Sequence, residues 1–145
     1  MSPAIQPLYN DLIRRGIDLQ CLCAQAAHKV AEPGLRVVLQ ENAAALELLI
    51  LDLQMQLAAT GGHAATRGRW GNVLQRRIDT WWMRGTPVSD HQWIRTLVRR
   101  EEQLLHALED AIERAPPGPS MALRRLLPRL ATVHMEMHSL VSAAR

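Results

Sequence analysis

The sequence predicts an all-α protein, an antiparallel four-helix bundle with one long crossover that carries a short extra helix. Apolar residues in every long segment recur with a period near 3.6, and no segment alternates as a β-strand does. Short breaks join the first long segment to the second and the third to the fourth, which indicates two helical hairpins. A much longer stretch, from Thr60 to Val88, separates the two hairpins and can traverse the bundle.

The composition indicates a single domain that spans residues 1–145. Apolar residues make up 48% of the chain, and the formal net charge is +3, which is low for a dedicated nucleic-acid binder. The two cysteines, Cys21 and Cys23, point about 200° apart on a helix and cannot pair locally. The N-terminus lacks a signal-peptide pattern, and no apolar run is long enough to span a membrane. We therefore expect a cytoplasmic protein with reduced thiols.

The first hairpin is predicted from helices over residues 5–30 and 35–59. Pro33 ends the first helix, because proline disfavours helical backbone at the residue before it. The glycines of TGG end the second helix. The two inward stripes are Ile5, Leu8, Leu12, Gly16, Leu19, Cys23, Ala26, Ala27 and Val30, and then Leu35, Val38, Leu39, Asn42, Leu46, Leu49, Ile50, Leu53 and Leu57.

The helix over 35–59 carries a second apolar face, made of Val37, Ala44, Leu48, Leu51 and Met55. A helix that is apolar on two faces needs two sets of neighbours. We expect this face either to seat the short crossover helix or to contact a second copy of the chain.

The crossover is predicted to contain a loop over 63–69 and a short helix over 70–83. Its tryptophans could plug the open side of the bundle, with the arginines in water. Interleaved basic and aromatic residues can also bind single-stranded nucleic acid. The residues for that alternative are Arg67, Arg69, Arg76, Arg77 and Arg84.

The second hairpin begins with a strong helix-start signal. Ser89 and Gln92 form a capping-box pattern, and Val88 and Trp93 occupy the two positions of a hydrophobic staple. This helix is predicted to end near residue 114, where the sequence APPGPS breaks the chain. The fourth helix is predicted over 121–144, with Pro128 either bending it or ending a first turn.

Five segments of the chain are AQAAHKVAEPGLRVVLQ, LAATGG, RGRWGNVLQRR, VRREEQLLHALEDAIERAPP and HMEMHSL. Together they resemble a ferritin-like family of small bacterial proteins, the domain of unknown function of the 2383 type. The resemblance covers nearly the whole chain, although its motifs are diffuse. It implies a ferritin-like four-helix bundle, which is also the topology that one long crossover indicates. It supplies no established activity.

Ferritin-like di-iron proteins use a Glu from each of two helices and a Glu-x-x-His motif from each of the other two. This sequence departs from that pattern in every helix. The stripe of the first helix holds no carboxylate, and Gln25 stands where we align the family's glutamate. In the second helix Glu41, Glu47 and Asp52 lie off the stripe, whereas Asn42 points inward. We therefore expect a degenerate metal site.

In the second hairpin, Glu101 and His134 fall on inward faces, His138 is marginal, and Glu136 points away. Hairpin pairing places Glu101 level with His134, which predicts a charge-assisted hydrogen bond that Asn42 could join. We interpret Glu101, His134 and Asn42 as a buried polar cluster that fixes helix register. The alternative is a transition-metal site, for Fe or Zn, made of Glu101, His134 and His138. Otherwise no cofactor is expected.

These observations favour a bundle that acts by binding other protein chains over one that acts as an enzyme, since no catalytic triad or phosphate-binding loop occurs. The expected partner is a second copy, in a homodimer, or another protein, and a stress-related role is one reading. Metal binding through Glu101 and His134 is the first alternative. Nucleic-acid binding through residues 67–84 is the second.

Overall fold

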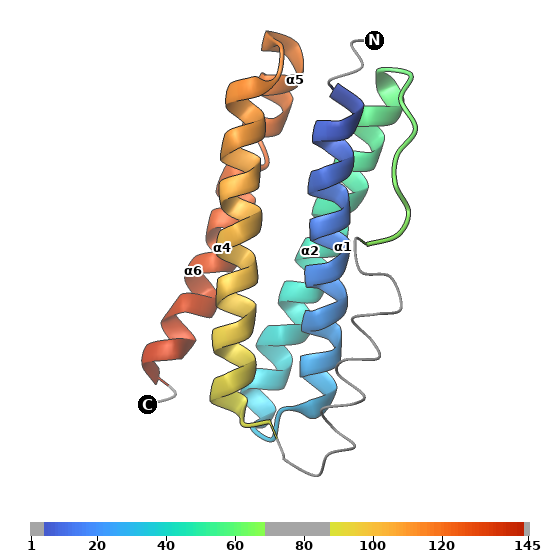
Figure 1. The fold of residues 1–145 in the computed structure, drawn as a ribbon. Coiled ribbons are helices and arrows are strands. Elements are labelled where there is room, and N and C mark those ends of the chain that lie inside the picture. The colour runs from blue at the N-terminus through green and yellow to red at the C-terminus, as the bar shows by residue number, and fades with distance from the viewer. Residues whose placement is uncertain (1–4, 69–87, 144–145) are drawn as a thin grey trace.

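In the computed structural model the protein is a bundle of long helices, as the sequence predicts (Figure 1). The structure describes residues 5–68 and 88–143, and these contain no β-strand. The elements are α1 (Ile5–Lys29), α2 (Pro33–Ala59), α4 (Asp90–Arg114), α5 (Pro117–Arg124) and α6 (Leu127–Ala143). The short helix expected over 70–83 lies outside the described residues. Within those ranges, no helix combines the length and apolarity needed to cross a bilayer.

The ends of α2 and α4 follow from local capping. Glu32 caps α2, because its carboxylate accepts hydrogen bonds from the backbone N–H groups of Gly34 and Leu35 at 2.9 and 2.6 Å. The helix therefore begins at Pro33, slightly before the predicted start, since proline suits a first turn. The predicted capping box of α4 is confirmed. The Gln92 backbone N–H donates to Ser89 Oγ at 3.2 Å, and Gln92 Oε1 accepts from the Ser89 backbone N–H at 2.8 Å.

The last part of the chain differs from the prediction of one helix over 121–144. The break after α4 is only two residues long, and Pro117 opens α5. The Ser120 hydroxyl donates to the Ile112 carbonyl at 2.7 Å, which ties α5 to the end of α4. A turn at 125–126 then separates α5 from α6, and Pro128 is the second residue of α6. Proline is tolerated there because a first-turn N–H has no helical partner to lose.

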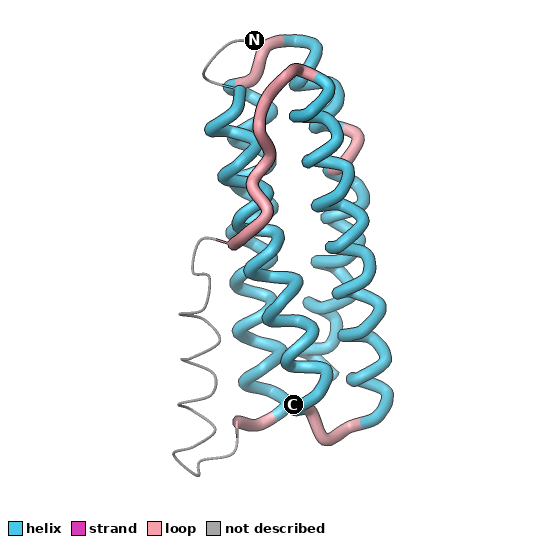
Figure 2. The backbone as a smooth tube through the Cα atoms, turned by 90° about the vertical axis from the view of Figure 1, so that its right-hand side faces the viewer, coloured by secondary structure: helices cyan, strands magenta, loops and turns pink. Residues whose placement is uncertain are grey.

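Figure 1 shows α1 and α6 running in one direction and α2 and α4 in the other. The seam between α1 and α2 is close at Gly16, where an added Cβ atom would lie 3.0 Å from Ile50 Cγ1. The seam between α2 and α6 includes an ion pair from Arg129 Nη1 to Asp52 Oδ2 at 2.9 Å. After α2, residues 60–68 run back along the outside of the helices (Figure 2).

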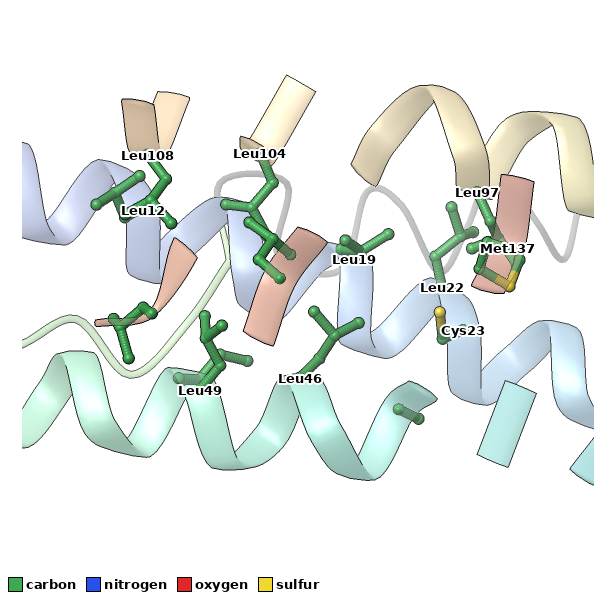
Figure 3. Packing of buried hydrophobic residues seen from close by; sticks show 14 of the residues in the cluster. Leu12, Leu19, Leu22, Cys23, Leu46, Leu49, Leu97, Leu104, Leu108 and Met137 are labelled. Atoms are coloured by element: carbon green, nitrogen blue, oxygen red, sulfur yellow. The ribbon is translucent and has the colours of Figure 1, made fainter. Parts of the chain in front are cut away.

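The core lies along the predicted stripes, and Figure 3 shows side chains of α1, α2, α4 and α6 meeting in it. Every residue of the α1 stripe except Leu8, and every residue of the α2 stripe except Val38, is buried. The α1 stripe was incomplete, and the last part of the chain contributes further buried residues. Tyr9, Ile13, Leu126 and Val133 are also buried there.

Candidate functional site

Glu101 of α4 and His134 of α6 face each other in the interior of the bundle. The Glu101 side chain is fully buried, and that of His134 is 16% exposed. Glu101 Oε1 lies 3.6 Å from His134 Nδ1, which is within reach of an electrostatic interaction but too long for a hydrogen bond. The pairing predicted from the sequence therefore occurs, but the predicted charge-assisted hydrogen bond is not made.

The polar atoms of this pair lack hydrogen-bond partners. Both carboxylate oxygens of Glu101 and Nδ1 of His134 are buried and unbonded. Burial raises the pKa of Glu101 to about 8, and the nearby charge of Glu136 adds to that rise. A carboxyl group with this pKa is mostly protonated at pH 7. We therefore describe the pair as a neutral acid beside an imidazole rather than as an ion pair.

Two further polar groups lie in the interior. Asn42 of α2 is 1% exposed, and its Nδ2 has no hydrogen-bond partner, so it does not bond to Glu101 or His134 as proposed from the sequence. Burial raises the pKa of the Cys23 thiol, and the charge of Glu101 contributes to that rise. A thiol with a raised pKa is a poor nucleophile, so Cys23 is a structural residue. Cys21 is exposed, which agrees with the prediction that the two thiols face apart.

The outer residues of the HMEMH segment do not complete a metal site with this pair. His138 is exposed and stacks edge-on against the His134 ring, with the centroids 5.9 Å apart. Glu102 Oε1 lies 3.9 Å from His134 Nε2, and Glu136 is exposed. Across residues 5–68 and 88–143, no group of three or more His, Cys, Asp or Glu side chains is arranged to hold a metal ion.

These residues do not fit the di-iron centre of ferritin-like proteins. Such a centre needs carboxylates from four helices, and the polar side chain that α2 turns inward is Asn42. The buried polar residues of α1 include Asn10 but no carboxylate. The described interior therefore offers one carboxylate and one imidazole, which are too few ligands for two iron ions.

The second apolar face of α2 is exposed. Six of its exposed residues are apolar, and together with Glu41 they occupy seven positions that alternate four and three residues apart. We call these seven residues the outer seam of α2: Val37, Glu41, Ala44, Leu48, Leu51, Met55 and Ala58.

A groove of about 410 Å³ adjoins the outer seam, between α2 and α6. The buried part of its lining consists of Asn42, Leu46, Leu49 and Val133, whereas Glu41 and Leu48 belong to both the groove and the outer seam. The unpartnered Asn42 amide therefore lies at the surface of a hollow that is continuous with exposed apolar residues.

Sequence reasoning missed a set of polar contacts near the start of α1, made by the buried residues Asn10 and Tyr9. Asn10 Nδ2 donates to the His63 carbonyl at 3.0 Å, and Asn10 Oδ1 accepts from the Ala65 backbone N–H at 2.7 Å. Tyr9 donates to Gln56 Oε1 at 2.7 Å. Asn10 lies roughly 160° from the centre of the predicted α1 stripe. It is buried where it hydrogen-bonds to residues 63 and 65, a contact that helical periodicity cannot indicate.

Of the residues considered for nucleic-acid binding, only Arg67 lies among the described residues, where it is exposed. Arg69, Arg76, Arg77 and Arg84 lie outside them. Comparisons of the chain with protein-family models, with curated proteins and with solved structures find no match. The resemblance to a ferritin-like family therefore rests on the five segments quoted above.

Proposed function

We propose that this protein is a ferritin-like bundle that has lost most di-iron ligands and acts without catalysis, by binding another protein chain through the outer seam of α2. The observation that carries the proposal is the exposure of large apolar side chains along one helix. Val37 is 52% exposed, Leu48 61%, Leu51 48% and Met55 72%. Removing such a row from water favours association, and contiguous exposed apolar residues are typical of interaction sites.

The spacing of the outer seam supports an α-helix as the occupant. Positions that alternate four and three residues apart form the row that a second helix packs against, knobs into holes. The inward face of α2 already packs against other helices of the bundle (Figure 3), with Leu39, Leu46 and Leu53 fully or almost fully buried. The same helix can therefore serve the core with one side and a partner helix with the other.

One feature supports the ferritin-like part of the proposal, and another supports the loss of the di-iron ligands. The long connection between α2 and α4 joins two helices that run in the same direction, as one long crossover requires (Figure 1). The interior that these helices enclose is apolar apart from a few residues, which supports a role that does not depend on metal chemistry.

Peptide binding tests this proposal directly. The probe is a fluorescent helical peptide with Leu at its a and d positions and uncharged Gln at e and g, used below the concentration at which it self-associates. We expect saturable binding to the wild-type protein, measured by anisotropy, and at least tenfold weaker binding to the Leu48→Lys, Leu51→Lys double variant. Met121→Lys is the matched control, because Met121 is 62% exposed and belongs to α5 rather than to the outer seam. Equal binding by all three proteins would overturn the proposal.

Metal binding through Glu101, His134 and His138 is the rival that a second measurement addresses. Near-stoichiometric iron or zinc in protein purified without chelators, lost in Glu101→Ala, would favour a metal-binding function instead. We expect metal content well below one ion per chain, and the same content in the wild type and the variant.

A further inference from the structure

The charges beside the outer seam specify which kind of helix it binds. Glu41 lies within the seam, and Glu47 lies beside Leu48 and Leu51 along its edge. Glu136 of α6 lines the adjoining groove together with Glu41. All three are exposed, and none of them forms an ion pair with another described residue.

The basic groups near this surface are already engaged or lie at its end. Arg129 is paired with Asp52 across the α2–α6 seam at 2.9 Å. Arg36 lies in the first turn of α2, where its Nη2 donates to the Val30 carbonyl at 3.1 Å. The surface is therefore locally acidic on a chain whose formal net charge is +3.

We propose that the outer seam of α2 binds an amphipathic helix of a different protein, whose apolar stripe is flanked by Lys or Arg. This inference rests on the proposed function and names the partner's chemistry. The apolar stripe covers Leu48, Leu51 and Met55, while the flanking cations meet Glu47 on one side and Glu136 on the other. A cation opposite Glu41 neutralises the one carboxylate within the seam, where an apolar residue would leave it desolvated.

A second copy of this chain fits the surface less well. In a two-fold pairing of α2 with itself, the centre of the interface meets its own copy. The outer seam spans residues 37–58, so its centre lies next to Glu47, and two-fold symmetry brings Glu47 close to Glu47 of the other copy. Like charges opposed in this way are unfavourable, whereas a basic helix is attracted.

Three versions of one helical peptide test the partner's charge. All have Leu at a and d, and they carry Lys, Gln or Glu at e and g. We expect the Lys peptide to bind at least tenfold more tightly than the Glu peptide at low salt, with the difference shrinking as salt rises. In the Glu41→Lys, Glu47→Lys double variant we expect the preference to reverse, so that the Glu peptide binds more tightly.

The outcomes separate this inference from the proposed function. Binding of all three peptides with equal affinity, abolished by Leu48→Lys with Leu51→Lys, would overturn the charge assignment and leave helix association intact. A preference for the Lys peptide that is unchanged in Glu41→Lys, Glu47→Lys would show attraction to other carboxylates and would also overturn it. Sedimentation showing a dimer that the neutral substitution Glu47→Gln strengthens would identify a second copy as the occupant instead.

Discussion

Two groups of buried polar residues in this bundle differ in whether their hydrogen bonds are satisfied. Near the start of α1, Asn10 uses both ends of its amide to hold residues 63–65, and Tyr9 donates to Gln56. In the middle of the bundle, Asn42, Glu101 and His134 leave buried donors and acceptors unpaired. The first group joins both residues 63–65 and α2 to α1. The second weakens the core in which it lies, because an unpaired buried polar group keeps its desolvation cost.

The largest expected effect is the pH dependence caused by Glu101. The folded protein holds the Glu101 proton more tightly than the unfolded chain does, since folding raises the pKa from 4.5 to about 8. The stability contributed by this group is therefore fully present below pH 4.5 and is lost as the pH rises to about 8. The loss amounts to roughly 5 kcal/mol.

Urea unfolding of the wild type and Glu101→Gln at several pH values measures this effect. We expect the free energy of unfolding of the variant, relative to that of the wild type, to rise steadily between pH 4.5 and 8. Parallel pH profiles would mean that Glu101 titrates normally, and the contrast between the two polar groups would lose its main support.

Asn10→Leu is the next largest change. It leaves the His63 carbonyl and the Ala65 N–H without their partner, so we expect the free energy of unfolding to fall by about 2–3 kcal/mol. Thermal and urea unfolding followed by circular dichroism would measure it. Unchanged stability would show that residues 62–68 are held by packing rather than by these hydrogen bonds.

Tyr9→Phe removes a single hydrogen bond from the same region while keeping the aromatic ring. We expect a loss of about 1 kcal/mol, since a net hydrogen bond contributes that order of stability. Asp52 provides a check that is independent of stability. Burial is the larger cause of the raised pKa of Tyr9, and the charge of Asp52 is the smaller one. Asp52→Asn should therefore lower the Tyr9 pKa in a spectroscopic titration.

The smallest expected change has the opposite sign. Asn42→Leu replaces an unpartnered buried amide with an apolar side chain of similar size, so we expect stability to rise by up to about 1 kcal/mol. It is also the matched control for Asn10→Leu, because the two substitutions are chemically identical. A loss of 2 kcal/mol or more would mean that Asn42 has partners that the contacts described above do not include.

Sequence reasoning succeeded where the physical cause is local. The glycines after Ala59, the capping box at Ser89 and the helical periodicity gave helix ends and inward faces close to those observed. The same periodicity placed Glu101 inside, and the structure agrees with that placement. Angular spacing also separated Cys21 from Cys23.

It failed where the cause is a contact between distant segments. The hydrogen bonds of Asn10 depend on where residues 63–65 pass, and no pattern within α1 contains that information. The Glu101–His134 distance is likewise set by how α4 and α6 pack. The positions of the two residues along the predicted hairpin therefore indicated that they pair, but not that the hydrogen bond between them is missing. Proline rules allowed a bend or a helix end at Pro128, whereas in the structure a turn at 125–126 precedes α6 and Pro128 lies in the first turn of that helix.

Asp90 ties the two halves of the molecule together at one end. Its carboxylate accepts the backbone N–H groups of Ala31 and Glu32 at 2.9 and 3.1 Å, so the first residue of α4 holds the turn between α1 and α2. Sliding α4 along α1 by one helical turn, about 5.4 Å, would break both hydrogen bonds at once. A single side chain thus sets the axial position of the second hairpin relative to the first, and with it the level at which Glu101 enters the core.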